Sequence, residues 1–163
     1  MKWKIRQEQE GDEAVIADVT RIAFEPKAFS DGTEETLPAK LREAGALILS
    51  LVAVNGKTVI GHVALSPAKV GDAKWLAVGP VSVLPDHQGK GIGSALVNHA
   101  VAVAQAYGRG GVVLEGDPAF YGRLGFVQSD ALTHQGKPSR HLQAITFDGD
   151  AEGDVEFHPV FSG

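Results

Sequence analysis

The sequence contains no cysteine. This absence excludes disulfide bonds, thiolate metal sites and a cysteine nucleophile. The six histidines are scattered, and none of them forms an H-E-x-x-H or similar paired spacing, so we expect no metal site. Ser82 and Ser94 lack a G-x-S-x-G context, which disfavours hydrolysis by a serine nucleophile.

Long apolar runs and clusters of Lys and Arg are also missing. No stretch approaches the roughly 18 apolar residues that cross a bilayer, and residues 1–4 lack a signal-peptide core. The net charge of −5, without a basic face, argues against sequence-independent binding of nucleic acid. Because 44% of the residues are hydrophobic and 21% charged, the composition is that of a globular protein. We therefore expect one soluble, cytoplasmic domain over residues 1–163.

The most informative feature that is present is the glycine-rich stretch at residues 81–94, VSVLPDHQGKGIGS. An apolar strand pattern leads through a proline-bounded turn into Gly89, Gly91 and Gly93, which open a helix. Glycine lets the backbone approach a ligand closely, and the first turn of a helix adds unpaired N–H donors and a positive dipole end. The stretch therefore predicts a phosphate or pyrophosphate pocket that is made mostly of main chain.

The spacing of these glycines distinguishes between kinds of phosphate loop. It matches neither G-x-x-x-x-G-K-[ST] nor the dinucleotide fingerprint G-x-G-x-x-G. It fits Q-x-x-G-x-G, filled by Gln88, Gly91 and Gly93. At this point the chain resembles the GCN5-related N-acetyltransferase (GNAT) superfamily, which carries such a loop between a strand and a long helix. A glycine turn with a purely structural role is the alternative.

A second motif extends the resemblance. Residues 117–126, DPAFYGRLGF, resemble the superfamily's short helix that ends in F-Y-x-x-x-G-F, and they follow the first motif by one expected helix and one expected strand. The chain looks closest to a small bacterial subgroup of predicted N-acetyltransferases. These share a Gly-Asp-Pro turn and a late aromatic strand, which correspond here to residues 116–118 and 155–161.

The resemblance implies an α+β fold with a mixed, mostly antiparallel central sheet that is flanked by helices and contains a splayed parallel strand pair. The alternation of apolar and polar residues predicts strands at 2–6, 47–54, 59–66, 74–83, 112–115, 141–147 and from 125 onward, and helices after Asp12, after Thr33 and over 91–107. Asn55-Gly56 predicts a hairpin turn. Gly79-Pro80 predicts either a bulge or a place where the neighbouring strand has already peeled away, because proline removes a ladder donor. Residues 128–139 are polar and predict a loop.

The resemblance also implies acetyl-coenzyme A as the cosubstrate. Amides of the loop would hold its pyrophosphate, and amides of the splayed central strand would hold the pantetheine arm and the acetyl carbonyl. The residues carried over as coenzyme-binding are Val81, Ser82, Val83, Gln88, Gly89, Lys90, Gly91, Ile92, Gly93 and Ser94. For Gly79-Pro80 an edge irregularity without a ligand is the alternative, and for Lys90 a solvated charge. Asp117 stands where many members have asparagine, which favours a helix cap instead of a coenzyme contact.

Acetyl transfer to an amine needs a polarised carbonyl, a neutral amine and a protonated leaving thiolate. The resemblance implies Tyr121 as the acid, because a phenol is protonated at neutral pH; packing as a core aromatic is its alternative role. Glu115 could act as the base through a water, or be a solvated charge at a strand end. His62 lies in mid-strand, where a histidine either faces a cleft or is a satisfied structural residue.

These features predict an N-acetyltransferase that moves an acetyl group directly to a primary amine of a small molecule or a protein. The alternatives are a non-catalytic acyl-coenzyme A-binding regulatory module and another enzyme that uses the glycine loop for a nucleotide phosphate. We expect the acceptor site at about residues 24–36 and 128–141, where acidic residues favour a cationic amine unless they form a solvated face. The late strand could pair with its counterpart in a second molecule, so the sequence leaves a homodimer as an open alternative.

Overall fold

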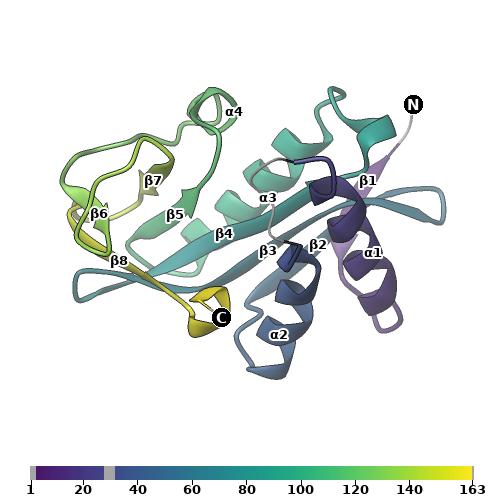
Figure 1. The fold of residues 1–163 in the computed structure, drawn as a ribbon, viewed down its shortest axis with the longest axis horizontal. Coiled ribbons are helices and arrows are strands. Elements are labelled where there is room, and N and C mark those ends of the chain that lie inside the picture. Colours follow the sequence, from purple (N-terminus) through teal and green to yellow (C-terminus); the bar gives the residue numbers. More distant parts are fainter. Residues whose placement is uncertain (1–2, 28–31, 163) are drawn as a thin grey trace. The chain divides into compact units, whose positions relative to one another are not determined.

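The computed structural model describes residues 3–27 and 32–162, and Figure 1 shows its elements. In chain order they are β1 (Lys4–Gln7), α1 (Glu13–Phe24), the 3-10 turn η1 (Glu34–Thr36), α2 (Leu37–Glu43), β2 (Leu49–Asn55), β3 (Thr58–Val70), β4 (Ala73–Val83), η2 (Pro85–His87), α3 (Ile92–Ala106), β5 (Gly111–Glu115), α4 (Pro118–Gly122), β6 (Leu132–His134), β7 (Leu142–Thr146), β8 (Gly153–Phe157) and η3 (Pro159–Ser162).

The sheet is mixed and mostly antiparallel, with β4 and β5 as a parallel pair, and helices flank it. The predicted fold class is therefore confirmed. The chain divides into two compact units, and the described residues of unit 1 fall within 1–65 and 79–100, those of unit 2 within 66–78 and 101–162. That residues 1–163 act as a single domain stays a prediction.

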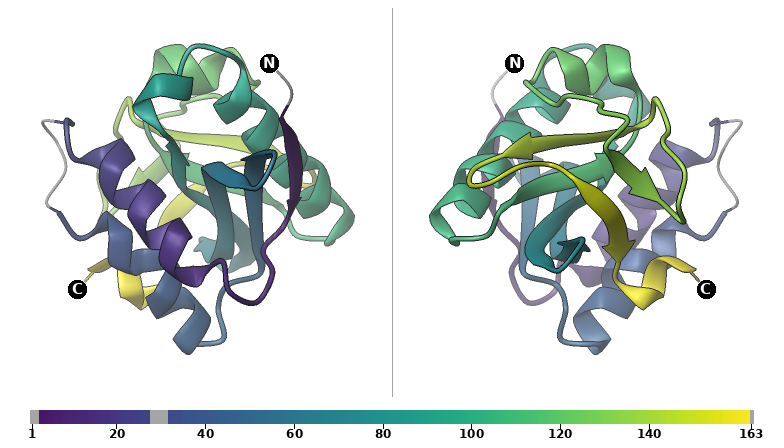
Figure 2. Two further views of the ribbon diagram at one scale, coloured as in Figure 1. Left: turned by 90° about the vertical axis from the view of Figure 1, so that its right-hand side faces the viewer. Right: turned by 90° about the vertical axis from the view of Figure 1, so that its left-hand side faces the viewer.

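Unit 1 is built on the antiparallel strands β1, β2 and the first part of β3. The predicted Asn55-Gly56 hairpin is confirmed, and Gly56 takes the left-handed φ of +64° that this turn requires. Ile16 and Val19 of α1 pack against valines of β2 and β3. Figure 2 shows α1 and α2 on one face of these strands and the start of α3 on the other.

Gly61 allows α3 to lie close to β3. A Cβ at this position would stand 3.1 Å from the Leu96 side chain and 3.1 Å from the Ser82 carbonyl oxygen, with Ile92 at 3.3 Å. Such contacts are tighter than an ordinary side chain accepts. The missing side chain therefore sets how near the helix and the strand β4 approach β3 in unit 1.

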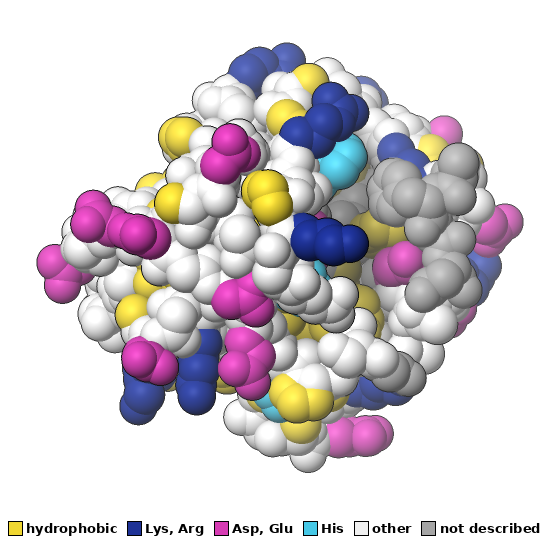
Figure 3. All heavy atoms as spheres, turned by 60° about the vertical axis from the view of Figure 1, so that its left-hand side comes forward, with side chains coloured by type: hydrophobic (Ala, Val, Ile, Leu, Met, Phe, Trp, Pro, Cys, Tyr) yellow, Lys and Arg dark blue, Asp and Glu magenta, His cyan; other side chains and the backbone are white. Residues whose placement is uncertain are grey.

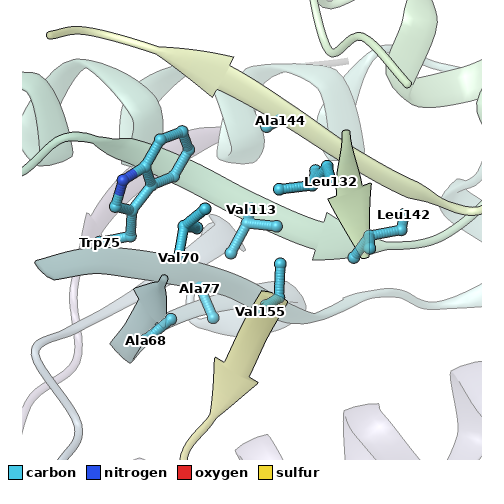
Figure 4. Packing of buried hydrophobic residues seen from close by; sticks show 9 residues of the cluster. All are labelled: Ala68, Val70, Trp75, Ala77, Val113, Leu132, Leu142, Ala144 and Val155. Atoms are coloured by element: carbon cyan, nitrogen blue, oxygen red, sulfur yellow. The ribbon is translucent and has the colours of Figure 1, made fainter. Parts of the chain in front are cut away.

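Unit 2 has its own apolar core, drawn in Figure 4. The members are Ala68, Val70, Trp75, Ala77, Val113, Leu132, Leu142, Ala144 and Val155. The indole of Trp75 lies against Gly110 and Gly111, where any Cβ would collide with it. Strand β5 pairs in parallel with β4 at Leu76↔Val112 and Ala77↔Val113, and antiparallel with β7 on its other side. β4 itself continues to Val83.

Three predictions for unit 2 were wrong in detail. The strand expected from Gly125 is only an isolated bridge between Val127 and Ala144. The expected loop at 128–139 contains β6, which pairs in parallel with β8. The late aromatic strand ends at Phe157 and continues as a 3-10 turn, since Pro159 lacks the N–H that a ladder needs. Strand β8 pairs with β6 on one side and with β3 on the other, and both partner strands belong to the same molecule.

In unit 1, two helix starts differ from the predictions, and the backbone at Gly79-Pro80 can be compared with its prediction. Asp12 does not cap α1, because its carboxylate accepts hydrogen bonds from Arg6 and from the Gln9 amide instead. The helix expected from Thr33 begins as η1 and becomes α-helical only at Leu37. At Gly79-Pro80 the structure has a cis peptide bond within β4, and the described pairing of β4 with β5 ends before it, at Ala77, as the second of the two expectations for this proline has it.

Three findings bear on function. Among the described residues, no helix has both the length and the apolarity that crossing a bilayer would need. On the face drawn in Figure 3, Lys and Arg side chains are interspersed with Asp and Glu. In the part of the chain that the structure describes, no group of three or more His, Asp or Glu is arranged to hold a metal ion.

Candidate functional site

The glycine loop lies in unit 1, between the end of β4 and the start of α3. Residues 88–91 are exposed, and two of them adopt left-handed backbone conformations, with φ of +76° at Gly89 and +85° at Gly91. No atom lies within 4 Å of where a Cβ would stand at either glycine. The loop therefore presents bare main chain to open space, as a phosphate cradle requires.

Helix α3 begins directly after this loop. Its first hydrogen bond runs from the Ala95 amide to the Gly91 carbonyl at 3.0 Å, so the amides of residues 92–94 lie in the first turn, where helices have no internal acceptor for them. Ile92 is buried and anchors the turn, whereas Gly93 and Ser94 are only partly buried. The predicted anion-binding amides are thus held on a fixed element.

Gln88 has a structural contact that sequence reasoning did not anticipate. Its exposed side-chain amide donates a hydrogen bond to the Val83 carbonyl at 3.0 Å, which ties the loop to the end of β4. Lys90 is exposed beside it. In the strand itself, Val81 and Val83 are partly buried while Ser82 is 1% exposed, so the side chains alternate between the two faces.

Unit 2 holds the second motif. Asp117 caps α4, because its carboxylate accepts a hydrogen bond from the Ala119 amide at 2.9 Å and Pro118 occupies the first turn. The predicted cap is therefore confirmed. The motif's aromatic residues meet edge to face, with the Tyr121 ring centroid 4.8 Å from Phe120 and 5.7 Å from Phe126.

The ring of Tyr121 packs against Gly116, the residue that directly follows β5. A Cβ at Gly116 would lie 2.5 Å from the Tyr121 ring, so only glycine leaves room for it. Burial, and to a smaller extent the negative charge of Asp117, raises the pKa of Tyr121 to about 12. The phenol is therefore protonated at neutral pH. Its packing with other aromatics, the alternative role considered from the sequence, is also present.

Glu115 ends β5 and meets a residue that sequence reasoning missed. Its carboxylate lies 3.2 Å from Nδ1 of His134, which the sequence placed in a loop but which belongs to β6. The His134 ring in turn packs edge to face on Phe157. Glu115 is 47% exposed. Only the pairing of β6 with β8 brings His134 here, and a three-residue strand leaves little pattern in a sequence.

His62 is completely buried on β3, with Nε2 2.7 Å from the Ser50 hydroxyl. Burial lowers the pKa of this histidine to about 4. Within the expected acceptor region of unit 1, a cavity of about 240 Å³ is lined by Arg21, Phe24, Glu25, Gly32, Glu34 and Glu35. Asp31, the remaining acidic residue of that region, lies outside the described residues.

Known proteins resemble the chain in sequence and in fold. A family model described as the acetyltransferase (GNAT) family matches residues 14–126. A GNAT family acetyltransferase from Brucella melitensis, crystallised in complex with acetyl-CoA, is 40% identical and has a TM-score of 0.86 over 98% of each chain. The GNAT family N-acetyltransferase YhbS from Escherichia coli, in complex with CoA, is 31% identical with a TM-score of 0.86, covering 100% of this chain and 93% of that chain.

A curated relative gives a shorter match. The uncharacterized N-acetyltransferase YhbS of Escherichia coli strain K12 is 38% identical over 103 residues, which make up 61% of this chain. The match spans 62% of that protein's length.

Proposed function

We propose, since this chain belongs to the acetyltransferase (GNAT) family, that it moves the acetyl group of acetyl-coenzyme A directly to a primary amine of a small molecule or a protein. The observation that carries the proposal is the pair of left-handed glycines, Gly89 and Gly91, that runs straight into the first turn of α3. Converging amides at a helix start bind a diphosphate without any side chain. The relatives crystallised with acetyl-CoA and CoA support this ligand.

The residues present fit the coenzyme. The loop from Gln88 to Gly91 is exposed and free of side-chain bulk at both glycines, and Lys90 adds a positive charge beside it. Acetyl-coenzyme A supplies the activated thioester. Backbone amides of residues 81–83 would bind its pantetheine arm and polarise the carbonyl, which stabilises negative charge as the amine attacks.

Tyr121 and Glu115 are the proposed catalytic residues of unit 2. The raised pKa of Tyr121 keeps its proton in place at neutral pH and makes the phenol a weak acid. We therefore assign it a hydrogen bond to the departing sulfur, completed by proton donation as charge builds up there. Glu115 would act as a base through a water, in competition with its contact to His134.

Primary amines are the proposed acceptors because a thioester carbonyl needs a strong neutral nucleophile. In unit 1, Glu25, Glu34 and Glu35 line the cavity of the expected acceptor region, and Arg21 offsets part of their charge. This lining favours amines that carry a second positive charge over anionic amines.

The proposal is tested by calorimetric titration with coenzyme A, followed by thiol release from acetyl-coenzyme A with a panel of primary amines. Gly91→Trp should abolish coenzyme affinity, since it fills the cradle and forces a bulky residue to a φ of +85°. Gly56→Trp is the matched control, because Gly56 has a φ of +64° and equally open surroundings in the β2–β3 hairpin.

Normal coenzyme binding by Gly91→Trp would show that the loop assignment is wrong. Coenzyme binding without thiol release for any amine would instead indicate a non-catalytic acyl-coenzyme A-binding module. Loss of affinity in both glycine variants would mean that folding, not the cradle, had been disturbed.

A further inference from the structure

Glu115, the proposed base, meets a histidine of β6 at the surface of unit 2. Its Oε1 lies 3.2 Å from Nδ1 of His134, and the two side chains are 47% and 33% exposed. Water and a small amine can therefore reach both, and His134 falls within residues 128–141, the second segment expected to hold the acceptor. The residue after Glu115, Gly116, packs against the ring of Tyr121, the proposed acid. The pair thus adjoins both groups to which the reaction is assigned.

The directions of the side chains on β5 and β6 bring this pair together. Val113 and Glu115 are two residues apart on β5, so they share one face of that strand. Leu132 and His134 have the same relation on β6. The inner members, Val113 and Leu132, pack in the core of unit 2, which Figure 4 shows. The outer members, Glu115 and His134, therefore meet where that core reaches the surface.

Backbone and ring contacts hold His134 in place. Its backbone pairs in parallel with β8, and its amide donates a hydrogen bond to the Lys137 carbonyl at 2.9 Å, which closes a tight turn. The central residues of this turn, Gln135 and Gly136, have φ of +55° and +79°. The imidazole itself packs edge to face on Phe157, with ring centroids 5.2 Å apart. The ring is therefore presented to Glu115 in a fixed orientation.

Asp154 of β8 anchors the same turn. Its carboxylate accepts hydrogen bonds from the Thr133 hydroxyl at 2.7 Å and from the Gly136 amide at 2.8 Å. These two donors stand before and after His134 in the chain, so the anchor holds the backbone on both sides of the histidine. Because β6 has only three residues, its ladder with β8 alone would hold His134 less firmly.

The contact with Glu115 determines which nitrogen of His134 carries a proton. An ionised carboxylate can only accept hydrogen bonds, so an unprotonated Nδ1 facing it would set lone pairs against lone pairs. Nδ1 therefore carries a proton whether the ring is neutral or charged. The contact is made by Oε1 of Glu115. Competition between the histidine and a water thus concerns one carboxylate oxygen, and Oε2 is left for the water.

We propose that His134 is a positioning residue, which orients the Glu115 carboxylate for its action as the base. This inference rests on the proposed acetyl transfer and on Glu115 as its base. The acceptor ammonium gives a proton to a water, and that water gives one of its own protons to Oε2 of Glu115. His134 keeps its proton throughout. By holding Oε1, it makes a long, half-exposed side chain present Oε2 in one direction, which spares the reaction the entropy of ordering it.

The test uses two substitutions of His134 that differ in where they place an N–H donor. The side-chain amide of asparagine can stand in for Nδ1, whereas the longer glutamine carries its amide to the place of Nε2. His134→Asn should therefore keep most of the turnover. His134→Gln should lower kcat by about 10-fold, less than the roughly 100-fold or more that a general base contributes. His158→Asn, at a partly buried histidine whose Nδ1 accepts from the Val160 amide, is the matched control and should keep full activity.

A double-mutant cycle separates positioning from a purely structural role. In a protein that already carries Glu115→Gln, His134→Gln should cause no further loss, because no carboxylate is left to orient. The readouts are kcat and KM for thiol release from acetyl-coenzyme A with the amine panel, together with calorimetric affinity for coenzyme A, which should stay unchanged in all variants.

Three results would overturn the positioning role: losses that add in the double variant, unchanged turnover in His134→Gln, or equal losses in His134→Asn and His134→Gln. Unchanged turnover in Glu115→Gln would overturn the assignment of the base and this inference with it. Failure of the unmodified protein to release thiol with any amine would instead overturn the acetyl transfer itself.

A measurement on the unmodified protein keeps the proposal testable if His134→Gln does not fold. In ¹⁵N-histidine NMR spectra, with His134→Asn used for assignment, the neutral ring of His134 should carry its proton on Nδ1. A proton on Nε2, with Nδ1 unprotonated, would contradict the proposal directly, since that nitrogen could then hold no carboxylate oxygen.

Discussion

At the scale of single residues, the candidate site depends on atoms that are missing as much as on those present. Gly91 and Gly89 leave the loop bare, and Gly116 leaves space for the ring of Tyr121. The first two could be predicted from the sequence, because alternating glycines before a helix are a local pattern. The role of Gly116 could not, since it depends on where a ring from the following helix lies.

Tyr121→Phe removes the phenol oxygen and keeps the ring. We expect turnover to fall by one to three decades with little change in coenzyme affinity, because the edge-to-face packing with Phe120 and Phe126 remains. The measurement is steady-state thiol release beside calorimetric titration with coenzyme A. Unchanged turnover would remove Tyr121 from the mechanism and leave only its packing role.

His62 makes the stability of the protein depend on pH. Its pKa is about 4 in the folded state against an ordinary 6.5, so the unfolded chain binds a proton more readily between these values. Stability is therefore full above pH 6.5 and is lost as the pH falls toward 4. A shift of this size corresponds to about 3 kcal/mol.

Urea unfolding at pH 7 and pH 4 checks this dependence. His62→Gln should lose about 3 kcal/mol less than the unmodified protein between the two pH values, since glutamine binds no proton. The hydrogen bonds from Arg42 and Ser50 outweigh burial and hold the pKa of Glu8 below its ordinary value. Glu8 therefore adds a loss in the same direction in both proteins. Equal losses for both would show that His62 is not the responsible group.

At the scale of elements, long patterned segments could be predicted and short paired ones could not. The β2–β3 hairpin and α3 follow from local turn chemistry and periodicity. Strand β6 has only three residues, and it exists because β8, far along the chain, pairs with it. The hydrogen bonds of Ser50 to Glu8 and to His62 show the same limit, because these residues lie far apart in the sequence and the pairing of β2 with its neighbours brings them together.

The short helix α4 depends on its cap. Asp117→Ala should lower the free energy of unfolding by about 1 kcal/mol, because the Ala119 amide loses its acceptor. Asp117→Asn is the matched control and should retain most of the stability, since an amide oxygen also caps. The charge of Asp117 raises the pKa of Tyr121, so both variants should lower that pKa. Denaturant unfolding and ultraviolet titration of the tyrosine measure the two effects, and a raised pKa would contradict the electrostatic assignment.

At the scale of the whole molecule, the fold class and the family could be predicted because two motifs occur in the right order. The acceptor could not, since its expected region has little pattern and part of it lies outside the described residues. A ligand that binds only the folded state stabilises the entire chain, so coenzyme binding has a global consequence.

Coenzyme A at about 100 times its dissociation constant should stabilise the protein by about 2.7 kcal/mol. For a chain of this size that amounts to a rise in melting temperature of roughly 5–10 °C. Pantetheine at the same concentration should give little rise, because it lacks the diphosphate that the amides around Gly91 would bind. Differential scanning fluorimetry with both ligands measures the difference. Equal shifts for the two would locate the binding energy in the pantetheine arm and its strand, away from the glycine loop.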